Sequence, residues 1–416
     1  MKFTKLEKSW ILYDVANSAF VLLVSTIIPI YFDYLGELGG LSETLYLAYW
    51  SYAASISTII VAFLGPILGT MADRKNYKKP IFTVMLLIGC VGCVILGFMG
   101  RWLPFLIVFI ITKVGYNSAN VFYDAMLTDV TTDERMDRVS SQGYAWGYIG
   151  SCIPFVIGLV FVLFYDSMGM TMKMAMGIAF WITAVWWFVM TLPLLKGYKQ
   201  THYVEATPGA VKATFKQLGH TFVDIVKKKS ILYFYIAFFF YIDGVYTIIE
   251  EATAYGTALG LDSTGLLLAL LVTQIVAFPC SIIFGVLSKK VNTEKLIPVC
   301  IIAYTLITVY AIFLNSLLKF WILAVCVGMF QGGIQALSRS YFGKIIPPEK
   351  SGNYFGVLDI CGKGASFLGT LTVGLVTQIT SNSGLGVGAL VIFFILGFIF
   401  FILSINTRKK EEAAIA

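Results

Sequence analysis

The chain is a succession of apolar segments, each long enough to cross a lipid bilayer. A helix needs about 20 mostly apolar residues to span the hydrocarbon core, where every backbone polar group must be paired within the protein. Only 13% of the 416 residues are charged and 58% are hydrophobic, whereas soluble domains carry about a quarter charged residues. The sequence therefore predicts an all-α polytopic membrane protein.

Twelve segments have this length and composition. We expect transmembrane helices at 10–33, 46–72, 80–100, 103–126, 139–164, 174–195, 231–257, 264–288, 296–314, 319–340, 352–378 and 384–405. The segment 352–378 is the weakest, because Asp359 and Lys363 interrupt it. An even number of spans places both termini on the same side of the membrane.

The basic residues identify that side. The N-terminus, every second loop and the C-terminus hold 25 of the 30 lysines and arginines, and the opposite loops hold three. Because such basic loops stay in the cytoplasm, we expect both termini to be cytoplasmic and the plasma membrane to be the location. Contact with anionic lipid headgroups explains the net charge of +7, so no nucleic-acid partner is expected. We refer to this side as the basic side.

A polar stretch at 196–230 divides the predicted spans six and six. The predicted domains are a six-helix bundle at 1–195, a cytoplasmic linker at 196–230 and a six-helix bundle at 231–416. Within the linker we expect Ala210 to Lys229 to form an amphipathic helix on the membrane surface. Its apolar side would carry Phe215, Leu218, Phe222 and Ile225.

The two predicted bundles contain similar segments at nearly constant spacing. Gly69 and Gly285 close equivalent segments at an offset of 216, and Gly150 and Gly369 lie at an offset of 219. Such offsets indicate an internal duplication. Pseudo-symmetric halves of this kind are typical of transporters that bind their solute near the membrane midplane.

Charged and amide side chains lie inside several of the apolar segments. Lys113, Asn117, Asn120 and Asp124 are spaced i, i+4, i+7 and i+11, which places them on one helical face. Charge in a bilayer costs at least a few kcal/mol, so these residues should face a bundle interior or a water-filled cavity. The remaining polar sets are Asp14 with Asn17, Asp243 with Thr247 and Glu250, Gln331 with Gln335, and Asp359 with Lys363.

The loop after the segment 46–72 resembles the signature of the major facilitator superfamily. It begins at Pro66 and runs through Gly69, Asp73 and Arg74 to Lys79, with Asn76 where that signature has glycine. Gly69 would permit close helix contact, and Asp73 could cap the N-terminus of another helix. In the second half Lys289 replaces the aspartate, so this lock is expected to be asymmetric.

Four further stretches resemble the Atg22-like family of major facilitator proteins, called UMF1 in bacteria. They are Trp10 to Phe20, Arg138 to Gly150, Asp243 to Ile249, and the pair Ser338 to Pro348 and Gly362 to Gly369. The resemblance covers both halves and implies a twelve-helix major facilitator fold and a secondary transporter. Its best-known eukaryotic members are linked to amino-acid export from the vacuole. Glu250-Glu251 departs from the uncharged residues that the family usually has there, and the role of Glu251 stays open.

In a major facilitator fold, spans 1, 4, 7 and 10 line the cavity, and most of the polar residues fall on those spans. The substrate-binding candidates are Asn17, Lys113, Asn117, Asn120, Asp243, Thr247, Glu250, Gln331 and Gln335. The candidates for carrying a coupling ion are Asp243, Glu250 and Asp14, since a desolvated carboxylate can titrate during a transport cycle.

The remaining polar residues are expected to have supporting roles. A gate on the basic side would use Gly69, Asp73, Arg74, Asp124 and Arg339. Asp359 and Lys363 lie i, i+4 apart and are expected to pair with each other. We expect Asp129, Arg135 and Arg138 to lie in a solvated loop.

The sequence thus predicts a monomeric proton-coupled transporter of a small polar solute, with amino acids or related metabolites as the leading class. A sodium-coupled glycoside transporter with a cation site at Asp14, Asn17 and Asp124 is the nearest alternative. A membrane sensor or scaffold that binds its partner through 196–230 is another. We find no Walker A motif, zinc-binding spacing or nucleophile elbow, so no enzyme activity, cofactor or metal site is predicted.

Overall fold

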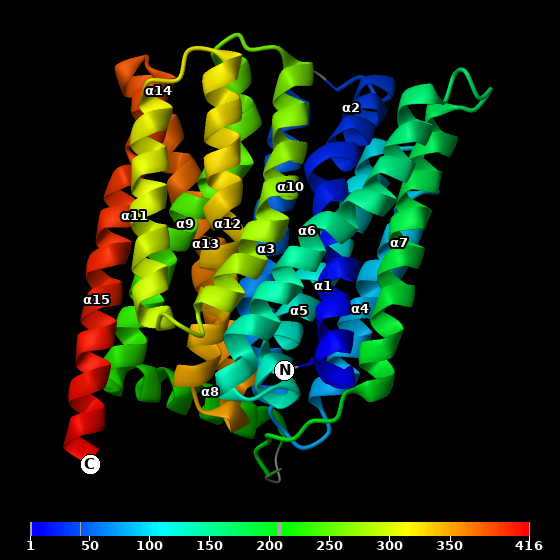
Figure 1. Ribbon diagram of the computed structural model, residues 1–416. Helices are drawn as coiled ribbons and strands as arrows, with labels where there is room; N and C mark the ends of the chain where they lie inside the picture. The colour runs from blue at the N-terminus through cyan, green and yellow to red at the C-terminus, as the bar shows by residue number, and fades with distance from the viewer. Residues whose placement is uncertain (1, 42, 206–209, 416) are drawn as a thin grey trace. The chain divides into compact units, whose positions relative to one another are not determined.

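The computed structural model describes residues 2–41, 43–205 and 210–415, and within helices it leaves out some side chains, among them those of 363–367 (Figure 1). The described chain is helical almost throughout, and its one isolated β-bridge joins Arg74 to Val204. Eleven of the described helical segments are long and apolar enough to cross a membrane. The predicted all-α membrane fold is confirmed.

The helices of the first half follow the predicted spans closely. They are α1 (Lys5–Leu22), the π-helical η1 (Leu23–Ile27), α2 (Ile28–Leu38), α3 (Glu43–Ala72), α4 (Lys78–Leu96), α5 (Trp102–Val130), α6 (Asp133–Phe164) and α7 (Met172–Gly197). The linker contains α8 (Ala210–Lys227) at the position predicted for a surface helix. Ile225 of α8 is buried and Phe222 is exposed, while Phe215 lies outside the described side chains.

The second half repeats this pattern. Its helices are α9 (Lys229–Ala258), α10 (Ser263–Leu287), α11 (Thr293–Ile312), α12 (Leu317–Ile345), the short 3₁₀ turn η2 (Pro348–Lys350), α13 (Ser351–Thr380), α14 (Ser383–Gly388) and α15 (Leu390–Ile415). α13 covers the span that we predicted to be the weakest, and its apolar stretch within the described residues is Leu368–Thr380.

Several helices continue past the predicted membrane boundary. α1 begins at Lys5 because Thr4 forms a capping box: the Glu7 N–H donates to Thr4 Oγ1 at 3.1 Å, and the Thr4 N–H donates to Glu7 Oε2 at 2.7 Å. α6 begins at Asp133, and α15 continues through the charged residues after Ile405. Hydropathy marks where lipid contact ends, not where a helix ends, so these extensions were not predicted.

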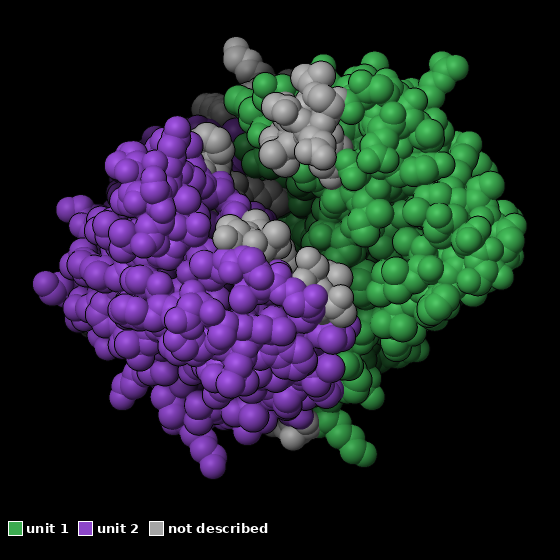
Figure 2. Space-filling model, turned by 90° about the horizontal axis from the view of Figure 1, so that it is seen from above, with its two compact units in different colours: residues 1–131, 146–206, 349–356 green, residues 132–145, 207–348, 357–416 purple. Residues whose placement is uncertain are grey.

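The chain forms two compact units, coloured separately in Figure 2. Unit 1 comprises Met1–Thr131, Trp146–Ala206 and Glu349–Gly356, and unit 2 comprises Thr132–Ala145, Thr207–Pro348 and Val357–Ala416. The first turns of α6 therefore belong to unit 2, and the first turns of α13 belong to unit 1. A division of the chain at the linker alone would miss this exchange.

Within unit 1, α1 packs against α7, α4 lies against α5 and α7, and α3 packs on α5. Its core is rich in buried aromatic rings: Trp10 stacks on Tyr123 with ring centroids 4.3 Å apart, and Phe20 lies 5.5 Å from Trp187. The opposite face of α4 exposes an apolar stripe at Val84, Leu87, Val91 and Ile95. A helix that is apolar on all sides, with one side facing outward, is expected in lipid.

Within unit 2, α9 packs along α15, α10 along α12, and α11 contacts α12 and α15. The core again consists of aromatic side chains, with Phe234 stacked on Phe342 at 5.3 Å and Tyr304 stacked on Phe394 at 5.6 Å. Because aromatic rings have few rotatable bonds, such cores hold the helices in a fixed register. This register determines where the polar side chains of α9 and α12 point.

Candidate functional site

The polar face of α5 meets α1 inside unit 1. Asn120 Oδ1 accepts hydrogen bonds from Tyr13 Oη at 3.3 Å and from Asn17 Nδ2 at 3.2 Å. Asn117 and Asn17 are buried, and Lys113 is half-buried with its Nζ 5.8 Å from the Phe109 ring centroid. The structure thus brings Asn17 together with the α5 face that the spacing predicted.

A neighbouring aromatic contact fixes this arrangement. Trp10 Nε1 donates to the Tyr123 carbonyl at 3.0 Å, and the two rings are stacked. This contact fixes the register of α1 against α5, and Trp10 lies about two helical turns before Asn17 on α1. Asp14 lies on α1 between these contacts and is 6% exposed, while Asp124 is half-buried.

In unit 2, a carboxylate lies between α9 and α13. Asp243 Oδ1 accepts from the Gly369 backbone N–H at 3.0 Å and from Thr247 Oγ1 at 3.2 Å. Both the Asp243 and Thr247 side chains are completely buried. Among the described residues, Asp243 Oδ2 has no hydrogen-bond partner. Glu250 lies on the same face two turns further along but is exposed.

α12 contributes a second buried oxygen without a partner. Gln331 is 5% exposed, and its Oε1 has no hydrogen-bond partner in the described part of the chain. Gln335 is half-buried one turn later. Tyr241 Oη and Ser338 Oγ lie 2.7 Å apart and join α9 to α12. A buried polar atom without a partner costs roughly 1–3 kcal/mol, so Asp243 Oδ2 and Gln331 Oε1 are both costly acceptors.

Asp73 caps α13 within unit 1. Its Oδ1 accepts from the Gly352 N–H at 2.7 Å and its Oδ2 from the Asn353 N–H at 2.9 Å, which are among the first free N–H groups of the helix. Gly69 permits this approach, because a Cβ there would lie 2.3 Å from the Gly352 carbonyl oxygen. Burial raises the pKa of Asp73 to about 7, although Lys78 and both N–H donors oppose this shift.

An ion pair beside this cap was not predicted. Lys78 Nζ lies 3.0 Å from Asp129 Oδ2, with both side chains fully buried, and also donates to Ser351 Oγ at 2.9 Å. The expectation that Asp129 lies in a solvated loop is wrong, since α5 continues to Val130 and the residue is only 8% exposed. Apart from the carboxylate itself, nothing in the sequence around Asp129 signals this burial.

Residues 198–205, directly after α7, pack onto the same region. Asp129 also accepts from Tyr198 Oη at 2.5 Å and from the His202 backbone N–H at 2.8 Å. The Val204 N–H donates to the Asp73 carbonyl at 2.8 Å, beside the bridge between Val204 and Arg74. This segment of the linker is therefore part of unit 1 and not a free tether.

A corresponding cluster in unit 2 surrounds the first turns of α6. Asp137 lies 2.6 Å from Lys344 Nζ and accepts from Ser340 Oγ and Thr293 Oγ1, each at 2.6 Å. Ser140 lies one turn after Asp137 on α6, and its Oγ accepts from Arg339 Nε of α12 at 2.9 Å. The asymmetry expected from Lys289 stays a prediction. In this cluster the acid, Asp137, lies on α6 itself, whereas Asp73 lies outside α13, the helix that it caps.

Arg339 makes further contacts inside unit 2. Its Nη2 donates to the Ser140 carbonyl at 3.1 Å, and its guanidinium lies 4.3 Å from the centroid of the Tyr144 ring. The predicted pairing of Arg339 with Asp124 stays a prediction. So does the pairing of Asp359 with Lys363, because the Lys363 side chain lies outside the described residues.

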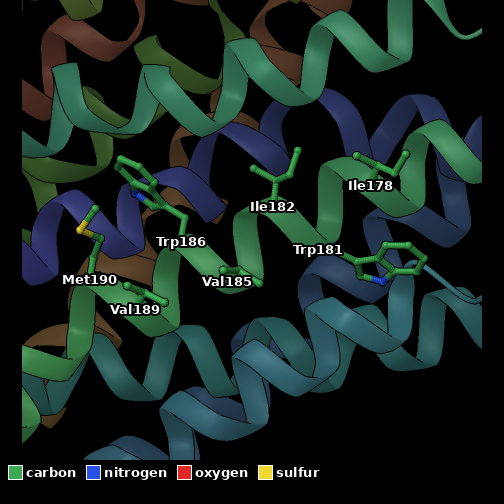
Figure 3. Close-up of a pocket in the computed structure, with 7 residues that line it drawn as sticks. All are labelled: Ile178, Trp181, Ile182, Val185, Trp186, Val189 and Met190. Atoms are coloured by element: carbon green, nitrogen blue, oxygen red, sulfur yellow. The ribbon is translucent and has the colours of Figure 1, made fainter. Parts of the chain in front are cut away.

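The groove on the surface of α7 in unit 1 is apolar throughout (Figure 3). It is lined by Ile178, Trp181, Ile182, Val185, Trp186, Val189 and Met190. Both indole N–H groups are already used: Trp181 donates to the Val94 carbonyl at 3.0 Å and Trp186 to the Val15 carbonyl at 3.1 Å. No polar atom in this groove is left to recognise a polar solute, so it is not part of the candidate site.

A family model described as "Vacuole effluxer Atg22 like" matches residues 4–414. The chain belongs to the Atg22-like family. The MFS-type transporter YxiO of Bacillus subtilis (strain 168) is 42% identical over 403 residues, which is 96% of this chain and 94% of YxiO. Autophagy-related protein 22-2 of Aspergillus clavatus is 26% identical over 282 residues, covering 61% of this chain and 46% of the fungal protein.

Solved structures of major facilitator proteins have the same fold. The E. coli fucose:proton symporter FucP aligns with a TM-score of 0.71 at 16% identity, over 96% of this chain and 97% of that chain. The human organic anion transporter MFSD10 aligns with a TM-score of 0.71 at 12% identity, over 95% and 99% of the two chains. At these identities the likeness concerns the fold alone. With the family match, it identifies the chain as a multi-pass membrane transporter of the major facilitator fold.

Proposed function

We propose that this member of the Atg22-like family is a proton-coupled secondary transporter that moves a small polar solute by alternating access. The observation that carries the proposal is the buried carboxylate of Asp243 between α9 and α13, with one oxygen bonded and the other without a partner among the described residues. A membrane helix retains such a costly group when it binds an ion or a solute.

Asp243 is the leading candidate for the proton carrier. Its complete burial shields it from water in this conformation, so a proton on Oδ2 would be held until the helices move. Glu250 is exposed on the same face and suits solute or proton exchange with water. Asp14, the third candidate, lies in unit 1 next to Asn17.

Amino acids and related metabolites are the proposed solute class. A zwitterion needs a cation for its carboxylate and acidic oxygens for its amine. The proposed candidates are Lys113 on α5 for the first and Asp243 or Glu250 on α9 for the second. Asn17, Asn117, Asn120, Thr247, Gln331 and Gln335 would contribute neutral hydrogen bonds. The description of the family as vacuole effluxers and the autophagy-related names of its fungal members agree with solute export, although this chain spans less than half of the Aspergillus clavatus protein.

We propose that the basic side is cytoplasmic and that its two clusters form the gate. The support is the distribution of Lys and Arg and the cap that Asp73 and Gly69 form on α13. The proposed gate also includes Asp124 and the buried Arg74 and Arg339. We further propose that the protein lies in the plasma membrane with both termini cytoplasmic and that it acts as a monomer.

Uptake into proteoliposomes tests the proposal. Labelled pools of amino acids and of sugars are supplied separately under an imposed proton gradient or sodium gradient. We expect proton-driven accumulation of an amino acid, loss of this accumulation in Asp243→Asn with exchange retained, and wild-type uptake in Glu205→Gln, whose side chain is exposed and outside the spans. Gradient-driven uptake that persists in Asp243→Asn would refute the assignment of the proton site.

The sodium-coupled alternative would place its cation at Asp14, Asn17 and Asp124. Of these, Asn17 is held by the bond from its Nδ2 to Asn120 Oδ1, which leaves its own oxygen out of that contact. Sodium-driven sugar uptake that disappears in Asp14→Asn would favour this alternative. No uptake from any pool would favour a sensor or scaffold.

A further inference from the structure

α9 and α13 approach each other in unit 2 so closely that only glycine fits at the contact. A Cβ added to Gly369 would lie 2.1 Å from Thr247 Oγ1 and 2.4 Å from Asp243 Oδ1. Both distances are far shorter than any van der Waals contact, and both neighbours are fully buried, so neither side chain can move into water. Any side chain at position 369 would push the two helices apart.

The close contact gives the Gly369 N–H an acceptor on another helix. Gly369 lies well inside α13, where backbone N–H groups normally bond only to the carbonyl four residues earlier. Here the N–H donates to Asp243 Oδ1 at 3.0 Å. A bond from a backbone amide to a buried carboxylate is strengthened by the charge and by the low local polarity.

The other groups around Asp243 are few. Thr247 Oγ1 donates to the same oxygen from α9, and Glu250, also on α9, is the charged group that acts on Asp243 through space. From α13, the described contact is the Gly369 N–H. From α12, Ser338 is bonded to Tyr241, not to Asp243. Gly369 is thus the one described donor to Asp243 that lies on a different helix.

We propose that Gly369 is a positioning residue for proton coupling, and this inference rests on the proposed role of Asp243. Its missing side chain lets the backbone N–H hold Oδ1, which leaves Oδ2 as the oxygen that binds the proton. The step is simple: Oδ2 of the carboxylate gains one proton from water on one side and later releases it to water on the other. Movement of α13 away from α9 breaks the N–H bond and thereby links proton binding to helix separation.

Infrared titration of the purified protein in lipid tests this inference without knowledge of the solute. The C=O band of a protonated carboxyl group that is present in the wild type and missing in Asp243→Asn reports Asp243. We expect Gly369→Ala to move the midpoint of this band to higher pH by about one unit or more, because the anion loses an N–H donor. Gly374→Ala on the same helix is the matched control, since nothing lies within 4 Å of a Cβ there.

A second variant covers the case in which Gly369→Ala does not fold. Thr247→Val removes the other donor without forcing the helices apart and should move the midpoint in the same direction. If both variants fold and titrate like the wild type, or if Gly374→Ala shifts equally, the inference is overturned. A merely structural glycine would lower stability and leave the midpoint in place.

The uptake assay separates this inference from the proposed function. Proton-driven uptake that survives in Asp243→Asn would overturn the proposed coupling role and, with it, the coupling role of Gly369. Uptake that is lost in Asp243→Asn, together with an unshifted midpoint in Gly369→Ala and Thr247→Val, would leave the coupling role of Asp243 standing and reject Gly369 alone.

Discussion

Replacing Asp129 with asparagine should destabilise the protein by about 3–5 kcal/mol, the usual cost of breaking a buried ion pair. The pair partner, Lys78, is fully buried and lies 3.0 Å from Asp129. At an effective dielectric constant of about 20, two unit charges at this distance attract each other by roughly 5–6 kcal/mol. Asparagine keeps the shape of the side chain, but it removes the charge that compensates Lys78 and places an NH2 group where one oxygen accepts from Tyr198 or from the His202 N–H.

An exposed pair on the same side provides the control. Lys75 and Glu205 lie 3.9 Å apart with side chains 50% and 77% exposed, and such pairs contribute about 0–1 kcal/mol. Glu205→Gln should therefore be almost neutral. The double variant Lys78→Met with Asp129→Leu should recover part of the loss, because it removes both charges while Tyr198 Oη and the His202 N–H lose their acceptor.

Thermal and denaturant-induced unfolding of the four proteins in the same detergent at pH 7 measures these differences. Equal small effects of Asp129→Asn and Glu205→Gln would refute the reasoning, since they would mean that the Lys78 charge reaches water. A double variant as unstable as Asp129→Asn would show that the hydrogen bonds accepted by Asp129, and not its charge, determine stability.

Three further predictions concern the two polar clusters and the loop between α3 and α4. Asn76 has φ 64°, so Asn76→Gly should be tolerated and Asn76→Val should cost about 1–2 kcal/mol in unfolding experiments. Burial raises the pKa of Asp73 to about 7. The folded state therefore binds the proton of this carboxyl group more tightly than the unfolded state does. The contribution of Asp73 to stability is thus largest below pH 4 and is lost as the pH rises through 7. Unfolding midpoints between pH 5 and 8 should therefore vary less in Asp73→Asn than in the wild type. Arg339→Lys should lose the bond from Nη2 to Ser140 and the contact with Tyr144, at a cost of about 1.5–3 kcal/mol in the same assay.

The fold was predictable because few backbone structures can satisfy their hydrogen bonds inside a bilayer. Long apolar segments at 10–33 or 103–126 can only be helices, and the family motifs supplied the topology. The cap at Asp73 was also predictable, since its position in the loop signature implies a helix N-terminus nearby. Asn76 in a glycine position is explained by its left-handed backbone, which asparagine adopts more readily than most other residues.

The buried charges on the basic side could not be predicted from hydropathy. Lys78, Asp129 and Asp137 lie beyond the apolar segments, where a polar residue is usually solvated. Each is enclosed by contacts within its own unit: Lys78 and Asp129 pair with each other and Lys78 donates to Ser351, while Asp137 pairs with Lys344. Sequence alone shows the apolar length of a helix, and long-range packing outside the bilayer leaves no periodic signal. The orientation of Asp243 toward Gly369 was not predicted either, because it depends on how α9 packs against α13 and hydropathy does not encode that packing.

The position of residues 349–356 in unit 1 has a consequence for biogenesis. Asp73 and Lys78 are completely buried, and they bond to Ser351, Gly352 and Asn353. During synthesis α3 and α4 are made long before these residues leave the ribosome, so Asp73 lacks its helix partner and Lys78 lacks its Ser351 acceptor until α13 is made. One of the last helices to be made thus completes the first half of the chain. A nascent chain that stops before α13 has an uncapped Asp73 and a Lys78–Asp129 ion pair without Ser351, which distinguishes it from the finished protein.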